Sequence, residues 1–193
     1  MTRIAAASRP DLPALRSDVW EPTKTTLHLW VQIVGKVKLA TTAPRNHWWN
    51  VPLYLDVRGL TTRRLHHAQV SFQIDFDFVD HRLLVRTNRG QQGSFGLHEG
   101  LSVACFDRQL HQLLDQFGVD VPIREDPYGV PITTPFPNDT EHAAYDPDSV
   151  LRYWQVLDWV DTVLEEFSGW YCGKQSPVHL FWHGLDLAVT RFS

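Results

Sequence analysis

The chain has 193 residues, 43% hydrophobic and 21% charged, a composition typical of one globular domain with a substantial core. Its formal net charge is -4 and its lysines and arginines are scattered among acidic residues, which argues against a general nucleic-acid binder. No apolar run reaches the length of a membrane span, and the N-terminus lacks the apolar core of a secretory signal. We therefore expect a cytoplasmic protein without a nucleic-acid or membrane partner.

The two cysteines, Cys105 and Cys172, have neither CxxC spacing nor a companion histidine pattern. They predict free buried thiols rather than a disulfide framework or a structural zinc site.

The first 40 residues divide into an arm and a helix. Residues 1–19 carry Pro10 and Pro13 and show no clear period, which predicts an irregular N-terminal arm on a single domain of residues 20–193. Residues 25–40 fit both a strand and a helix template, because their apolar residues alternate and also fall in one arc of a helical wheel. We favour the helix, since the polar arc is continuous and the segment is long for a strand.

The middle of the chain predicts a meander of strands. Residues 51–57 alternate like a strand covered on one side, 61–68 are expected to be a loop, and 70–78 alternate strictly, with one wet face. Two short turns then lead into two further strands, and Arg82 and Arg86 are expected to face Asp75 and Asp77 across the hairpin.

Two more helices are marked by their ends. Ser102 is expected to cap a helix that closes at Gly118, and Asp146-Pro147 to start another that runs to Gly169. Between them, residues 119–125 predict a short strand or extended edge, and the proline-rich residues 126–145 a long surface loop.

The C-terminal run, residues 176–193, is apolar on both faces when read as extended chain, with Gly184 as a bend or bulge. It predicts a central strand. The fold class is α+β, a single domain with a mainly antiparallel sheet (the meander plus the C-terminal central strand) packed with about three helices.

Four blocks carry a family resemblance: TLHLWVQIVGKVKL, NHWWNVPLYLDVRGLTT, IDFDFVDHRL and SPVHLFWHGLDLAVTRFS. They resemble an uncharacterised bacterial family known only as a domain of unknown function, over the chain from about residue 20 to the end. The resemblance implies no activity. Its pattern includes the positions of His28, His47, Trp48, Trp49, Asp80, His81, His179 and Trp182, and it omits those of His66, His67 and His183.

The function favoured by the residues is binding or transformation of a small molecule in a pocket lined by tryptophan and histidine. The walls would come from Trp30, Trp48, Trp49, Trp182 and Tyr54. Lys36, His47 and Arg191, together with His28, would hold a polar or anionic ligand.

Two alternatives remain open. A metal-dependent enzyme would hold zinc or non-haem iron with His28, His47, His81 and His179 and with Asp80 or Asp186. The expected catalytic residues are His47, His81, His179 and Asp80. This alternative predicts that His47, His81 and His179 meet in one cleft. No HExxH motif supports this divalent-metal hypothesis, and each lone histidine is more often structural. A non-catalytic interaction protein would need an exposed apolar patch, for which residues 126–145 are the candidate. The substrate, the reaction and the oligomeric state are not specified by these residues.

Overall fold

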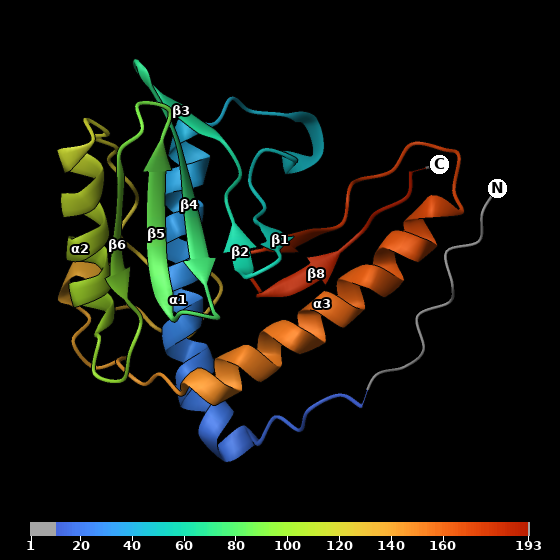
Figure 1. The fold of residues 1–193 in the computed structure, drawn as a ribbon, viewed down its shortest axis with the longest axis horizontal. Coiled ribbons are helices and arrows are strands. Elements are labelled where there is room, and N and C mark those ends of the chain that lie inside the picture. Colours follow the sequence, from blue (N-terminus) through green and yellow to red (C-terminus); the bar gives the residue numbers. More distant parts are fainter. Residues whose placement is uncertain (1–10, 193) are drawn as a thin grey trace.

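The alternating segment at residues 70–78 forms the longest strand of the protein, β4 (Val70–Asp77). Its inward side chains, from Val70 to Phe78, are at most 2% exposed and build the core. The structure, a computed structural model, describes residues 11–192. Figure 1 shows β4 beside β5 (Arg82–Thr87), with α1 (Ser17–Thr41) behind these strands and α2 (Val103–Gln116) beside β6 (Gln92–Gly96). A strict period of two therefore predicted both the strand and its buried face.

An antiparallel six-stranded sheet surrounds β4 in the order β1-β2-β4-β5-β6, with β3 also paired to β4. The other strands are β1 (Tyr54–Asp56), β2 (Gly59–Thr61), β3 (Leu65–His67), β5 (Arg82–Thr87) and β6 (Gln92–Gly96). Strands β2 and β3 both pair with the same edge of β4. Strand β2 lies opposite residues 75–77, and β3 lies opposite residues 70–72. The predicted meander of β4, β5 and β6 is confirmed, as is the α+β class.

Three helices pack with this sheet: α1 (Ser17–Thr41), α2 (Val103–Gln116) and α3 (Pro147–Gly169). Both predicted caps are present, since Ser102 Oγ accepts from Cys105 N at 3.2 Å and Asp146 Oδ1 accepts from Ser149 N at 2.7 Å. In Figure 1, α3 runs diagonally away from the sheet, with the hairpin of β7 (His179–Phe181) and β8 (Asp186–Ala188) alongside it. No helix of the described residues is long and apolar enough to cross a membrane.

Helix α1 is buried on nearly all sides from residue 26 to residue 38. Trp30, at its centre, stacks on Phe106 of α2 with ring centroids 5.1 Å apart, and Phe106 stacks in turn on Phe76 of β4 at 6.0 Å. The helix predicted over 25–40 is confirmed, but its polar arc does not face solvent, which is unusual for an amphipathic helix.

The predicted C-terminal central strand is wrong. Residues 176–193 instead contribute β7 (His179–Phe181) and β8 (Asp186–Ala188), a separate two-stranded hairpin joined to the rest by a bridge between Leu53 and Leu180. The chain reverses over residues 182–185, where Leu185 adopts a left-handed φ of 55° and Gly184 N donates to Phe181 O at 3.2 Å. Nothing in the identity of a leucine marks such a turn, so the apolar pattern alone suggested a continuous strand.

Other boundaries also differ from the predictions. Residues 51–57 are not one strand: the chain turns at Val57, which is 80% exposed, between β1 and β2. The expected loop at 61–68 contains β3, and residues 119–125 form no strand. Helix α1 begins at Ser17, inside the expected arm, while residues 1–10 of that arm lie outside the described part.

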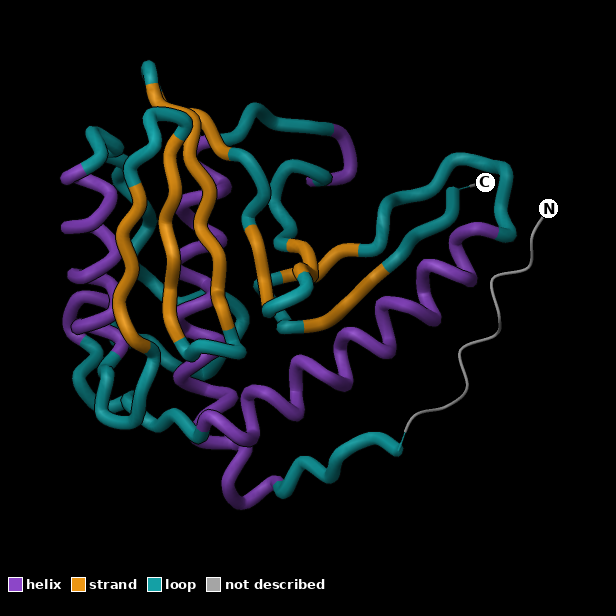
Figure 2. The backbone as a smooth tube through the Cα atoms, in the orientation of Figure 1, coloured by secondary structure: helices purple, strands orange, loops and turns teal. Residues whose placement is uncertain are grey.

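The long connection between α2 and α3 is mostly loop, as expected. It contains one short helix, η2 (Phe136–Asn138) (Figure 2). A second short helix, η1 (Asn46–Trp48), precedes β1. Cys105 and Cys172 are free, but neither is fully buried, and Cys172 is exposed.

Candidate functional site at the turn between β7 and β8

The polar arc of α1 forms the base of the site. His28, Gln32 and Lys36 are spaced four residues apart, so they lie in one row along the helix. Gln32 binds the backbone of Tyr128 twice: its Nε2 donates to Tyr128 O at 2.9 Å and its Oε1 accepts from Tyr128 N at 2.8 Å. Lys36 Nζ donates to Asp126 O at 2.5 Å. The row therefore fixes residues 126–128 of the long loop against the helix.

His28 attaches the same helix to the turn between β7 and β8. Its Nε2 lies 3.0 Å from the carbonyl oxygens of both Trp182 and His183. Because these two acceptors lie closer than the amide nitrogen of Gln32, which is 3.3 Å away, Nε2 carries the proton and Nδ1 is left as an acceptor. Burial lowers the pKa of His28 despite the two carbonyls, so the ring is neutral near pH 7.

Gly35 explains how the turn comes so close to the helix. A Cβ at this position would lie 2.4 Å from the ring of Trp182, closer than any real contact. Trp182 is 3% exposed, and its Nε1 donates to Val51 O at 3.2 Å. Glycine in the middle of a helix costs about 1 kcal/mol relative to alanine, and here it makes room for an indole.

His183 lies next to Trp182 in the same turn and is half-buried. Its ring stacks on Trp182 with centroids 3.6 Å apart and meets Tyr128 edge-on at 5.3 Å. The ring centroid of Trp48 lies 6.3 Å from that of His183. Within residues 11–192 neither ring nitrogen of His183 has a hydrogen-bond partner, and burial lowers its pKa, with Lys36 and His28 adding to the effect against Asp186. A neutral, half-buried imidazole is thus left free to bond a ligand.

The two side chains that flank His183 are themselves open to solvent. Trp48 and Tyr128 are each 61% exposed. Trp48 and its neighbour His47 both hold left-handed backbone angles, φ 57° and 55°, which cost of order 1–3 kcal/mol for residues other than glycine. Such strain persists only where the surrounding structure enforces it, and it presents the Trp48 ring beside the turn. We call His28, Trp48, Tyr128, Trp182 and His183 the His183 cluster.

A second aromatic group takes up other predicted residues. The ring of His47 lies 4.4 Å from Phe192 and 5.5 Å from Trp49, and Lys174 Nζ donates to His47 Nε2 at 3.2 Å. Arg191 packs over the Phe167 ring at 3.4 Å and donates to the Phe167 carbonyl. His47 and Trp49 therefore pack on Phe192, and Arg191 joins this end of the chain to α3.

His81 and Asp80 lie in a third place, at the turn between β4 and β5. His81 Nδ1 is 2.9 Å from Tyr145 Oη, in the segment that leads into α3. Asp80 accepts from Arg58 at 2.7 Å and from Arg82 at 3.1 Å. Both residues are thus occupied by contacts that hold the turn.

His179 and Lys38 form a fourth, buried group. His179 Nδ1 donates to Pro177 O at 2.7 Å, while its Nε2 is buried and has no partner within residues 11–192. Burial lowers the pKa of His179, and Lys38 adds to this. Lys38 is 4% exposed, and its Nζ donates to Pro52 O at 2.5 Å and Thr62 O at 2.8 Å. Burial lowers the Lys38 pKa to about 7.

The predicted catalytic residues therefore do not share one cleft. Within residues 11–192, no three or more His, Cys, Asp and Glu side chains are arranged to hold a metal ion. His47, His81 and His179 each bond to different elements, and the metal-dependent alternative has no ligand set in this part of the chain.

Two grooves formed by residues 11–192 have no tryptophan in their lining. One, about 390 Å³, lies between the start of α1 and residues 141–144. The other, about 480 Å³, lies on β4 and β5 and includes Arg64, Ser71 and Arg86. The loop 126–145, expected to expose an apolar patch, exposes one large hydrophobic side chain, Tyr128.

A family model described as "Family of unknown function (DUF5996)" matches residues 12–193, nearly the whole chain. The chain belongs to this family. For this DUF5996 member, no match was found among curated proteins, and none among solved structures. The resemblance to an uncharacterised family is thereby confirmed, and the site must be interpreted from its own geometry.

The predicted ligand-binding residues include His28, Lys36, Trp48 and Trp182, which lie in or beside the His183 cluster, but not His183 or Tyr128. Tyr128 lies 96 positions along the chain from Gln32, and His183 lies 155 positions from His28. Only the bonds of Gln32 and His28 reveal that these segments meet.

Proposed function

We propose that the chain binds a planar small molecule at the His183 cluster, with the imidazole of His183 as its polar contact. The observation that carries this proposal is the state of His183: half-buried, neutral because its pKa is lowered, and without a protein partner for either ring nitrogen in the described residues. A free neutral imidazole can donate one hydrogen bond and accept another, or move a proton near neutral pH.

The aromatic surroundings support a planar ligand. Trp48 and Tyr128 present rings to solvent on two sides of His183, and such rings bind flat molecules by offset or edge-on stacking. Burial lowers the pKa of His183 although the charge of Asp186 opposes it, so the uncharged ring can donate a hydrogen bond to an acceptor on the ligand.

The proposal places the protein in the cytoplasm, with a small molecule rather than a nucleic acid as its partner. The two free cysteines and the formal net charge of -4 support this placement.

The test is a thermal-shift screen of planar heteroaromatic acids on the wild type and three variants. His183→Ala and Trp48→Ala remove the proposed contacts, while Trp170→Ala removes a tryptophan that is 79% exposed at the end of α3 and serves as the matched control. A ligand at 100 times its Kd stabilises the folded state by about 2.7 kcal/mol. We expect compounds that stabilise the wild type and Trp170→Ala but lose the effect in the other two variants. Stabilisation that is equal in all four proteins would contradict the proposal.

A further inference from the structure

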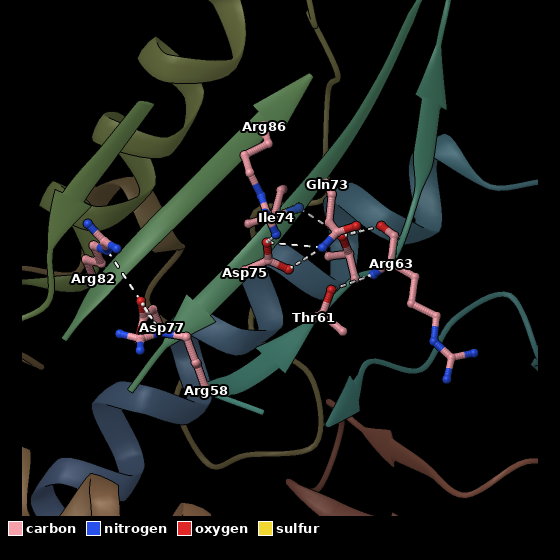
Figure 3. Close-up of polar contacts among 10 residues, drawn as sticks. Arg58, Thr61, Arg63, Gln73, Ile74, Asp75, Asp77, Arg82 and Arg86 are labelled. Carbon is pink, nitrogen blue, oxygen red and sulfur yellow. Dashed lines mark hydrogen bonds and ion pairs between the residues drawn. The ribbon is translucent and has the colours of Figure 1, made fainter. Parts of the chain in front are cut away.

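The outward face of the sheet carries a dense set of arginines and carboxylates. Asp75 and Asp77 are only 6% and 4% exposed, although no helix of residues 11–192 covers this face in Figure 1. Arginine side chains from β5 and from the turn between β1 and β2 cover them instead (Figure 3). Arg86 Nη2 lies 2.7 Å from Asp75, and Arg58 and Arg82 lie 3.0 and 3.4 Å from Asp77. The cross-strand pairing expected from the sequence is confirmed.

One arginine on this face has no carboxylate partner among residues 11–192. Arg64, just before β3, has no carboxylate within 4.0 Å among the described residues, and its Nε and Nη2 both donate to the neutral hydroxyl of Ser71, at 3.2 and 3.1 Å. Ser71 Oγ also lies 3.2 Å from His66 Nδ1. A guanidinium oriented by a hydroxyl keeps its full charge for another partner.

Arg64 lines the groove of about 480 Å³ on β4 and β5, together with Arg86. This volume is within the range of small-molecule sites. Arg86 is already oriented by Asp75, whose two oxygens also accept from Gln73 Nε2 at 2.8 and 3.1 Å, and its remaining N–H groups stay available. Gln73 pairs with Arg86 in the ladder of β4 and β5, so the groove floor is a rigid sheet.

The other end of the groove supplies neutral donors. Asn88 Oδ1 accepts from Ser71 N at 3.0 Å, which fixes the amide group. Its Nδ2 makes no bond within residues 11–192 and is available to a ligand oxygen. Two guanidiniums beside a free amide N–H group match the several oxygens of one tetrahedral anion.

We propose that this groove binds a phosphate group, as the free ion or as a small phosphate monoester, between Arg64 and Arg86. A nucleic acid is a poorer fit, because the outward positions of β4 are Ser71, Gln73, Asp75 and Asp77, with no aromatic ring on which a base could stack. The carboxylates there also repel a long polyanion. The site is separate from the His183 cluster and does not depend on it.

The probe is inorganic phosphate, titrated at constant ionic strength into the full chain labelled with ¹⁵N. We expect saturable shifts of the backbone amides of Ser71, Thr87 and Asn88. Arg64→Gln is expected to weaken phosphate binding about tenfold or more, since a hydrogen bond to a charged group contributes about 1.5–3 kcal/mol. The control Arg89→Gln removes an exposed arginine of the next turn, outside the groove lining, and is expected to leave the affinity unchanged.

Two further arms separate phosphate from other anions and from misfolding. Acetate at the same ionic strength is expected to give weaker, non-saturating shifts, and Asn88→Asp, which places a negative charge in the groove, is expected to abolish phosphate binding while its circular dichroism remains that of the wild type. Shifts that fail to saturate, or an affinity that is unchanged in both Arg64→Gln and Asn88→Asp, would overturn the proposal. Acetate binding as tight as phosphate would overturn the assignment to phosphate.

Discussion

Lys38 is a buried lysine in the last turn of α1, and its titration makes stability depend on pH. Burial lowers its pKa to about 7, and the positive charges of Arg63 and Arg45 add to this. In the unfolded chain a lysine keeps its proton up to a pKa of about 10.4. Below pH 7 both states are protonated. As the pH rises through the folded pKa, the folded state releases a proton that the unfolded state keeps, so stability increases with pH up to the unfolded pKa.

The magnitude follows from these two values. A tenfold change in an equilibrium is about 1.4 kcal/mol, so the full effect is roughly 4–5 kcal/mol, of which about 2–3 kcal/mol falls between pH 7 and 9. A neutral amine still has two N–H groups, enough for the carbonyls of Pro52 and Thr62. Lys38→Met removes the titration and leaves both carbonyls without their donor, which costs about 1–3 kcal/mol each at every pH.

The assay is urea unfolding of the wild type and Lys38→Met across the range from about pH 6 to 9. We expect the free energy of unfolding of the wild type to rise with pH relative to that of the variant. Lys24→Met, an exposed lysine of the same helix, is the control and is expected to parallel the wild type. Burial raises the pKa of Tyr145 and Tyr153, which destabilises the fold only above their unfolded pKa of about 10. Parallel curves for the wild type and Lys38→Met would refute the reasoning.

Three other predictions concern packing and pairing. Gly35→Ala is expected to destabilise the fold by about 1–3 kcal/mol and to alter near-ultraviolet dichroism, because its Cβ displaces Trp182; a variant more stable than the wild type, as helix propensity alone would give, would contradict this. Tyr153→Phe removes the hydrogen bond from the Tyr153 hydroxyl to Leu185 O at 2.7 Å. It should lower the free energy of unfolding in urea by about 1–3 kcal/mol. An unchanged urea midpoint would show that this bond between α3 and the β7–β8 turn does not stabilise the fold. Asp77 has its pKa lowered: burial opposes ionisation, but the bonds from Arg58 and from the backbone of Asp80 outweigh it. The contribution of Asp77 to the free energy of unfolding is therefore present above the unfolded pKa of about 3.9 and is lost as the pH falls through the folded pKa. Asp77→Asn should make the free energy of unfolding fall less steeply at acid pH. An acid dependence identical to that of the wild type would contradict this.

The parts of the fold that local chemistry specifies were predictable. Ser102 and Asp146 mark two helix starts through their side-chain oxygens, and the alternation of β4 identifies its buried face. The hairpin of β7 and β8 was not, because its turn depends on a left-handed leucine, and Trp182 in that turn is buried against Gly35 of α1.

The candidate site was also predictable only where local sequence specifies it. The polar arc of α1 was visible in the sequence, yet a solvent-facing arc and an arc covered by a loop have the same pattern. What distinguishes them is the fit of Gln32 to the backbone of Tyr128 and of Gly35 to Trp182, contacts between segments about 100 and 150 residues apart. Such pairings arise from tertiary packing and leave no local signal.

The measurement that tests the central claim most directly is an NMR titration that follows the histidine rings while a stabilising compound is added. The account predicts that the His183 ring signals shift first and saturate, and that in the free protein His183 titrates below the ordinary histidine pKa of about 6.5. Shifts confined to His66 on the sheet or His142 at the other groove, with His183 unmoved, would contradict it.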